Sequence, residues 1–333
     1  MSSPFDSYMS RALHLAVSDD APRGVNPRVG CVLVGDSGLI GEGHHRGAGT
    51  AHAEIDALMS CTVSPRGATA IVTLEPCAHT GRTGPCADAL IDAGVARVVY
   101  AQSDPTVQAS GGAQRLRDAG IEVISGVLQE HAEAVNADWT FMKTHGRPHV
   151  SLKLAGSLDG KVDSRAAERL LLTGSQSQAL VHQLRSGVDA IAVGSGTLIA
   201  DDPELTVRGI ESANQPLRVI LGTTAVPEEA KVLRGNTDLL VITERNPRGA
   251  LAELASRGVQ RLLLEGGPTV AAAYLEAGLV DEVHWFVSPI LVGQGVSALN
   301  GLGSQQALDV TSVDVVGEDV YIVGVPAPRG SQE

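Results

Sequence analysis

Four side chains in the first third of the sequence, His52, Glu54, Cys77 and Cys86, have the types and spacing needed for metal-assisted hydrolysis. A catalytic zinc ion usually has three protein ligands, for which histidine and cysteine are suitable, and a fourth position open to water. We therefore expect His52, Cys77 and Cys86 to be the metal ligands. Glu54 follows His52 by two residues, where a carboxylate can take a proton from water and pass it to a leaving amine. The pattern predicts hydrolysis by a zinc-activated water.

The predicted ligands lie where a strand or a loop runs into a helix. Helical composition covers 51–59, a strand over 68–74 ends shortly before Cys77, and a second helix over 86–93 starts at the other cysteine. The partial positive charge of a helix N-terminus favours the thiolate form of a nearby cysteine, and the thiolate is the form that binds a metal. The expected local structure therefore supports metal ligation.

A structural zinc site is the alternative for these residues, and it stays open. Structural sites usually have four protein ligands, and three histidines are available as a fourth: His44, His45 and His79. The glutamate beside the first ligand favours a catalytic site. The two remaining cysteines, Cys31 and Cys61, have no partner at a metal-like spacing, and we expect both to be small core residues.

Composition and charge limit the possible functions. Apolar residues make up 43% and charged residues 19% of the 333 residues, which is typical of a globular protein. The formal net charge is -13, and acidic residues outnumber basic ones 16 to 10 over 1–146 and 22 to 15 over 147–333, so we expect no nucleic-acid partner. No apolar stretch reaches the roughly 18 residues of a membrane helix, and residues 1–15 show no apolar core behind a basic start. We expect no membrane association and a cytoplasmic location.

The length favours two domains, and both halves alternate strands with helices, which predicts two α/β domains. A helix over 129–144 is followed by Gly146-Arg147-Pro148, where glycine and proline mark a boundary. We place the domains at 1–146 and 147–333. In the second, strands are expected over 149–154, 190–194, 217–222, 239–243, 261–265 and 282–289, and helices over 176–186, 250–257 and 270–277.

The second half offers one local feature of its own, the turn Glu265-Gly266-Gly267-Pro268-Thr269 before a helix at Val270. Free backbone N–H groups in such a turn can bind phosphate. The turn does not match the G-x-G-x-x-G fingerprint of dinucleotide-binding proteins, so an ordinary connection between strand and helix remains an equal alternative.

The first half resembles the zinc nucleobase deaminases, whose H-x-E and P-C-x-x-C signature includes the glutamate as general acid and base. Here eight residues, rather than two, separate the cysteines. The segment Pro76-Cys77-Ala78-His79-Thr80-Gly81-Arg82-Thr83-Gly84-Pro85-Cys86, with Asn26-Pro27-Arg28-Val29-Gly30 and Gly43-His44-His45, is similar to the deaminase domain of the RibD family of bifunctional riboflavin-biosynthesis enzymes. This resemblance implies a cytidine-deaminase-like α/β/α layered sheet, with substrate contacts at Asn26, His44 and Arg82.

The second half resembles the reductase domain of the same family, which is similar to dihydrofolate reductase and uses NADPH. The resemblance is carried by four segments in family order: Ser157-Leu158-Asp159-Gly160-Lys161, Gly194-Ser195-Gly196-Thr197 with Ala200-Asp201-Asp202-Pro203, Leu205-Thr206-Val207-Arg208, and the Glu265-Gly266-Gly267 turn. It implies NADPH contacts at Ala155, Leu171, Thr197, Asp201, Gly267, Pro268, Thr269, Val270, Ala271, Ala272 and Ala273. It implies substrate contacts at Arg169, Arg185, Leu205, Arg208 and Glu265, and arginine suits a phosphate group.

The resemblance implies two consecutive reactions on a phosphoribosylaminopyrimidine. The first is hydrolytic deamination of 2,5-diamino-6-(5-phosphoribosylamino)pyrimidin-4(3H)-one, and the second is reduction of the ribosyl group to ribityl by NADPH. Where the family has a Ser-x-Trp-Ile-Thr type segment, this chain has Arg169-Leu170-Leu171-Leu172-Thr173. This departure leaves open a deaminase with a non-catalytic nucleotide-binding second domain. A tRNA or nucleoside deaminase is a separate alternative, and the acidic charge of both halves argues against an RNA substrate. Two α/β domains with apolar faces also make a homo-oligomer, a dimer or tetramer, an expected state.

Overall fold

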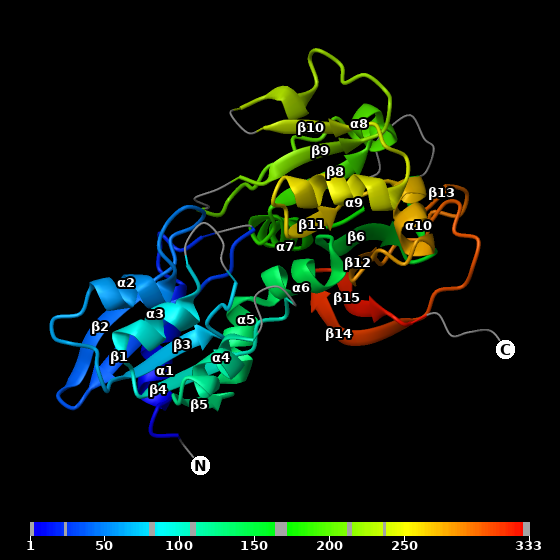
Figure 1. Cartoon of the computed structure of the whole chain (residues 1–333). Helices are drawn as coiled ribbons and strands as arrows, with labels where there is room; N and C mark the ends of the chain where they lie inside the picture. The colour runs from blue at the N-terminus through cyan, green and yellow to red at the C-terminus, as the bar shows by residue number, and fades with distance from the viewer. Residues whose placement is uncertain are drawn as a thin grey trace. The chain divides into compact units, whose positions relative to one another are not determined.

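The computed structural model describes residues 3–22, 25–79, 84–106, 111–163, 172–211, 215–235 and 238–328. The chain forms two compact units, Met1–Gly146 and Arg147–Glu333 (Figure 1). No helix among the described residues is both long enough and apolar enough to cross a membrane.

The first unit is built on a five-stranded sheet with the strand order β2-β1-β3-β4-β5. Its strands are β1 (Gly30–Gly35), β2 (Gly38–His44), β3 (Thr69–Leu74), β4 (Arg97–Gln102) and β5 (Glu122–Ser125). Its helices are α1 (Asp6–Ala16), α2 (Ala53–Met59), α3 (Cys86–Ala93), α4 (Gly112–Asp118), α5 (Gln129–Val135) and α6 (Ala137–His145). Strand β1 is antiparallel to β2 and β3, whereas β3, β4 and β5 are parallel.

Helices cover both faces of this sheet. Successive residues of a strand point to opposite faces, so neighbouring residues of β1 pack against different helices. Leu33 of β1 packs in the cluster formed with α2, α3 and α4, which includes Leu90. Val32, the preceding residue, packs on the other side with α1 and α5, in a cluster that includes Met9. The arrangement confirms the predicted α/β/α layered sheet.

The single helix expected over 129–144 is two helices, α5 and α6, separated at Asn136. The Asn136 side chain is buried, and its backbone has φ −108° and ψ 16°. Its Oδ1 accepts a hydrogen bond from the Arg28 N–H, and its Nδ2 donates one to the Arg28 carbonyl. This long-range bond to the segment before β1 accompanies the break in the helix.

The second unit is built on an eight-stranded sheet with the order β10-β9-β8-β11-β6-β12-β15-β14, beside a two-stranded sheet of β13 and β7. Its strands are β6 (His149–Ser157), β7 (Lys161–Asp163), β8 (Ala190–Gly194), β9 (Leu217–Leu221), β10 (Leu239–Ile242), β11 (Arg261–Leu264), β12 (Glu282–Ser288), β13 (Val296–Ser297), β14 (Leu308–Val316) and β15 (Asp319–Pro326). Its helices are α7 (Ser175–Ser186), α8 (Ser195–Asp201), α9 (Pro247–Ser256), α10 (Pro268–Glu276) and the short 3-10 helix η1 (Lys231–Leu233).

The six strands from β10 to β12 are parallel, and β15 and β14 extend the sheet in antiparallel fashion. Helices α9 and α10 pack on one face, and α7 and α8 pack on the other. The hairpin of β14 and β15, which makes one edge of the sheet, is absent from the sequence-based expectations.

Candidate functional site

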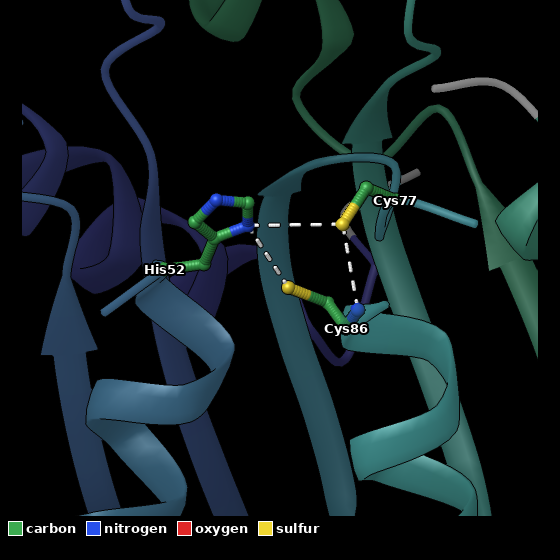
Figure 2. A group of neighbouring side chains, drawn as sticks. All are labelled: His52, Cys77 and Cys86. Atoms are coloured by element: carbon green, nitrogen blue, oxygen red, sulfur yellow. Dashed lines mark hydrogen bonds between the residues drawn. The ribbon is translucent and has the colours of Figure 1, made fainter. Parts of the chain in front are cut away.

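The three predicted metal ligands converge from separate elements of the first unit. His52 precedes α2, Cys77 follows β3, and Cys86 is the first residue of α3. The His52 Nδ1 atom lies 3.2 Å from the Cys86 Sγ atom and 3.7 Å from the Cys77 Sγ atom (Figure 2). All three ligand atoms lie within 4.8 Å of one another. Nitrogen and sulfur donors this close together could hold one zinc ion.

The loop that carries Cys77 is fixed by close backbone packing against α4. A Cβ atom at Gly112, the first residue of α4, would lie 1.7 Å from the Pro76 carbonyl oxygen, so only glycine fits there. Glu75 Oε1 accepts hydrogen bonds from the N–H groups of Gly111 and Ala113 at the start of that helix. These contacts hold the loop that presents the first cysteine.

The donor chemistry fits zinc with one open position. Among the described residues, no other histidine, cysteine, aspartate or glutamate joins the group of three. The His45 ring lies 5.4 Å from the His52 ring between centroids, and its Nδ1 is within hydrogen-bond distance of the Ala51 carbonyl oxygen. The hydrogen bond from Cys86, together with His52, lowers the pKa of the Cys77 thiol, which favours the ligating thiolate. Three protein ligands are typical of catalytic zinc and favour it over a structural site.

Glu54 lies in the first turn of α2, two residues from the first ligand, and is 4% exposed. Burial raises the pKa of its carboxyl group to about 7. A general acid or base is most effective when its pKa lies near the working pH, because it can then both accept and release a proton. The position and the environment of Glu54 both suit the predicted proton transfer.

A cavity of about 310 Å³ lies over this group. His52, Cys77 and Glu54 contribute to its wall, so a molecule in the cavity can reach the ligand group and the carboxylate. The rest of the wall comes mainly from three regions: the segment before β1, the loop after β4, and α6. Asn26, predicted to touch substrate, lies in the first of these regions.

The second predicted substrate residue, His44, is turned to other partners. Its Nε2 lies 2.7 Å from an Asp20 carboxylate oxygen, and its N–H donates to Asp56 Oδ2. The neighbouring His45 contributes to the cavity wall instead. Arg82, the third predicted residue, lies outside the described residues.

Several cavity residues were not named as substrate contacts from the sequence, although the segment Asp104-Pro105-Thr106-Val107 departs from the Asp-Pro-Asn-Pro of the family in a way that could alter pyrimidine or ribose contacts. They are Glu75, His79, Asp104, Thr106, Trp139 and Lys143. Asp104 and Thr106 follow the carboxyl end of a parallel strand, a common place for ligand-binding residues in α/β sheets. That rule is the signal by which they could have been found.

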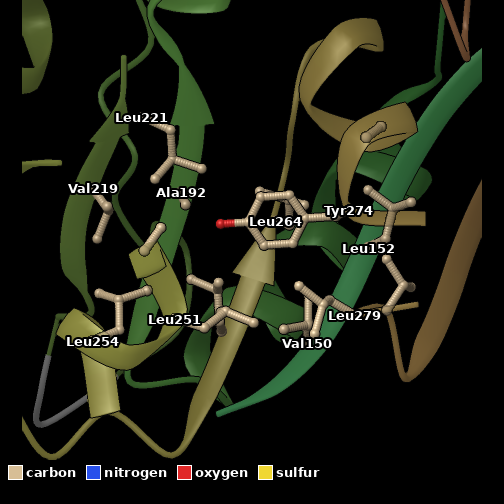
Figure 3. Close-up of a cluster of buried hydrophobic side chains, with 14 of the residues drawn as sticks. Val150, Leu152, Ala192, Val219, Leu221, Leu251, Leu254, Leu264, Tyr274 and Leu279 are labelled. Atoms are coloured by element: carbon tan, nitrogen blue, oxygen red, sulfur yellow. The ribbon is translucent and has the colours of Figure 1, made fainter. Parts of the chain in front are cut away.

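The glycine turn of the second unit connects β11 to α10 and lies close to α8. Gly267 has φ 88°, and a Cβ atom there would lie 2.5 Å from Thr197 Oγ1. No side chain caps the N-terminus of α10, which begins with Pro268. Buried residues of β11, β6 and α10, including Leu264, Leu152 and Tyr274, form the core beside this turn (Figure 3). A helix N-terminus without a side-chain cap can bind the phosphate groups of a cofactor such as NADPH.

Arg185 and Glu265, both predicted to touch substrate, bind each other. Arg185 Nε and Nη2 donate to the two carboxylate oxygens of Glu265 over 2.5 and 2.8 Å, and Nη1 donates to the Thr206 carbonyl. Their side chains are 12% and 8% exposed. Burial acts to raise the pKa of Glu265, but Arg185 outweighs it and the pKa is lowered. The pair therefore stabilises the fold above about pH 4.3, and this contribution is lost as the pH falls through the lowered pKa.

Replacing Arg185 with methionine is expected to lower the free energy of unfolding by about 3 kcal/mol, because the Glu265 carboxylate would stay buried without its partner. Arg208→Met is the control: that side chain is 59% exposed and binds Glu204 on the surface, so the expected change is below about 1 kcal/mol. Denaturant unfolding at pH 7 measures both. Equal losses of unfolding free energy in the two variants would contradict the expected effect of burying the pair.

The remaining predicted reductase residues differ in their access to a ligand. Ala155 in β6, Asp201 at the end of α8, and Thr269 and Ala273 in α10 are half-buried or exposed. Ala271 and Ala272 are buried in α10. The Leu205 side chain is buried in the apolar cluster beside α8, so only its backbone could meet a substrate. Arg169 and Leu171 lie outside the described residues.

The chain matches two family models, one in each unit. The cytidine and deoxycytidylate deaminase zinc-binding region matches residues 3–102, and the RibD C-terminal domain matches residues 148–322, more than half of the chain. The chain belongs to the RibD family. The riboflavin biosynthesis protein RibD of Aquifex aeolicus is 38% identical over 95% of this chain and 97% of its own. That of Mycobacterium tuberculosis is 40% identical over 89% and 90%.

Solved structures of RibD proteins share the whole fold. A diaminohydroxyphosphoribosylaminopyrimidine deaminase/5-amino-6-(5-phosphoribosylamino)uracil reductase from Thermotoga maritima has a TM-score of 0.78 at 32% identity and covers 97% of this chain and 99% of its own. A RibD structure from Acinetobacter baumannii has a TM-score of 0.78 at 34% identity, with coverage of 97% and 98%. The chain is thus a bifunctional enzyme of riboflavin biosynthesis, with a zinc-dependent deaminase domain and a dihydrofolate-reductase-like domain that uses NADPH.

Proposed function

We propose that this chain deaminates 2,5-diamino-6-(5-phosphoribosylamino)pyrimidin-4(3H)-one at the His52, Cys77 and Cys86 site and then reduces the ribosyl group of the product to ribityl. We assign the first reaction to residues 1–146 and the second to 147–333. The observation that carries the proposal is the group of three ligands beside the buried Glu54, in a cavity of a RibD-family chain.

In the deamination, the protein residues hold the metal and move the protons. The His52 Nδ1 and the thiolates of Cys77 and Cys86 would hold zinc, which would activate a water to serve as nucleophile for the amine-bearing carbon. The Glu54 carboxylate takes a proton from the water and delivers a proton to the departing amino group, which leaves as ammonia. Because Glu54 has a pKa of about 7, it can perform both transfers near neutral pH.

In the reduction, the second unit orients the two reactants. NADPH supplies the hydride, and the protein supplies binding and orientation. The turn at Gly267 and the start of α10 would hold cofactor phosphate, beside Thr197. Arg185 already binds the Glu265 carboxylate. We therefore propose that these two side chains, which together carry no net charge, orient the substrate, and that Arg185 does not act as a free cation for phosphate.

Two readouts on the diamino substrate test the proposal. We expect ammonia release without NADPH, and NADPH oxidation only once the deaminated product has formed. Ammonia release without any NADPH oxidation would show that the chain acts only as a deaminase. Release of ammonia from RNA in preference to the small substrate would contradict the assignment of the first unit.

We further propose that the chain forms a homodimer through β14. This strand is an edge of the eight-stranded sheet, and Val313 and Val315 on it are 61% and 78% exposed. An open edge with exposed β-branched residues is suited to pairing with a second copy. Sedimentation velocity at micromolar concentration is expected to show a dimer, and a monomer at all concentrations would contradict this.

We place the enzyme in the cytoplasm because its metal site needs reduced cysteines. Cys77 and Cys86 are free thiols, and thiols stay reduced in the cytosol but oxidise in secretory compartments.

A further inference from the structure

The wall of the deaminase cavity contains one side chain whose chemistry the proposed reaction has not used. Lys143 lies in α6 and is exposed. It is the only lysine or arginine that the cavity wall contains within the described part of the chain. Residue 143 also lies beyond the segment 3–102 that matches the deaminase zinc-binding region.

The helix that carries Lys143 is held firmly against two other parts of the cavity wall. Asn136, which precedes α6, exchanges two hydrogen bonds with the Arg28 backbone, next to the wall residues Asn26 and Pro27. One turn further on, Thr140 Oγ1 accepts a hydrogen bond from Gln102 Nε2 at the end of β4. The backbone of α6 is therefore fixed relative to the segment before β1 and to the loop that carries Asp104.

Trp139 shows which face of α6 turns to the cavity. It is 5% exposed, packs in the main core cluster of the unit and contributes to the cavity wall. Residues four apart lie on the same face of a helix, so Lys143 extends the same face by one turn. The buried tryptophan anchors the helix, and the flexible stem of the lysine lets its ammonium group reach over the cavity mouth.

Carboxylates outnumber lysine and arginine in the described part of the wall, so an anionic substrate would gain from a cation there. Three carboxylates contribute to the wall: Glu54 is the proton shuttle, Glu75 binds two N–H groups of α4, and Asp104 binds Thr106. A phosphate monoester carries close to two negative charges at pH 7 and would be repelled by such a wall alone. A lysine at the rim offsets this repulsion.

We infer that Lys143 binds the phosphate group of the deaminase substrate. The inference rests on the proposed function, because only the phosphoribosyl substrate brings a phosphate to this cavity. The remaining polar groups of the wall then face the pyrimidine and ribose. Lys143 acts in binding and takes no part in proton transfer.

The test compares the phosphorylated substrate with the same ribosylaminopyrimidine lacking phosphate. Lys143→Met is expected to raise the KM for the phosphorylated substrate about tenfold, with kcat within about twofold, since one charge-assisted contact is lost. For the phosphate-free substrate the KM should not change. Lys143→Arg should keep most of the affinity. Arg117→Met removes a cation of α4 that is exposed and not part of the wall, and it should change neither constant.

The outcomes separate the inference from the proposed function. Equal KM changes for the two substrates, or no change for either, would overturn the role of Lys143 while ammonia release by the unaltered enzyme still supports the function. No ammonia release from the phosphorylated substrate by the unaltered, zinc-loaded enzyme would overturn both.

Discussion

Glu54→Gln is expected to lower the rate of ammonia release by about 10²- to 10⁴-fold, the usual contribution of a general acid and base. Glutamine has nearly the same shape as glutamate but cannot carry the proton between water and the leaving amine. Zinc content should not change, because Glu54 is not part of the group of three ligands. Assays of ammonia and of bound zinc on the same sample make the measurement.

The reductase reaction provides the internal control for this variant. NADPH oxidation with the deaminated substrate uses the second unit, so its rate should equal that of the unaltered enzyme. Ammonia release at the full rate by the zinc-loaded Glu54→Gln variant would contradict the role of Glu54 in proton transfer. Loss of both activities would instead indicate damage to the fold.

Cys86→Ala is expected to abolish zinc binding under ordinary assay conditions and, with it, ammonia release. Changes to residues that only hydrogen-bond a metal ligand already lower metal affinity about 10- to 100-fold, and removal of one of three ligands should exceed this. Cys86 is buried, with its Sγ 3.2 Å from His52 Nδ1, so no other side chain is placed to substitute for it among the described residues.

Cys61→Ala is the matched control for the loss of a thiol. The Cys61 Sγ lies within hydrogen-bond distance of the Ala57 carbonyl oxygen within the first unit, and Cys61 is not part of the metal group. We expect this variant to keep its zinc and its ammonia release. Metal analysis and the ammonia assay compare the two variants, and loss of zinc from both, or from neither, would contradict the ligand assignment.

The metal site was the part of the function most open to prediction from sequence. Cysteine and histidine have few uses at such spacing, and the elements around His52, Cys77 and Cys86 start or end as expected. The sequence alone did not show which of the adjacent histidines His44 and His45 faces the cavity. The orientation of His44 depends on Asp20, which is 24 residues earlier in the sequence and whose Oδ1 lies 2.7 Å from His44 Nε2 in the folded chain.

Long-range pairing explains the other differences. Arg185 looks like a free phosphate ligand in sequence, but a carboxylate 80 residues away binds it in the folded chain. The bonds of Asn136 to a backbone 108 residues earlier separate α5 from α6. The β14 strand was missed because Thr311, Ser312 and Asp314 interrupt its apolar residues, as is common in an exposed edge strand.

Long-range contacts also explain why the role of α6 in the cavity was not predicted. Its sequence pattern predicts a helix and says nothing of the wall it forms. Only the folded structure brings Trp139 and Lys143 beside residues of the metal site more than fifty positions earlier.

Reversible removal of zinc tests the central claim most directly. Chelation of the unaltered enzyme, with zinc content measured in each sample, should abolish ammonia release in proportion to zinc lost, while NADPH oxidation with the deaminated substrate continues. Addition of one equivalent of zinc per chain should restore ammonia release. Ammonia release that persists at full rate in zinc-free enzyme would contradict a deaminase centre at His52, Cys77 and Cys86.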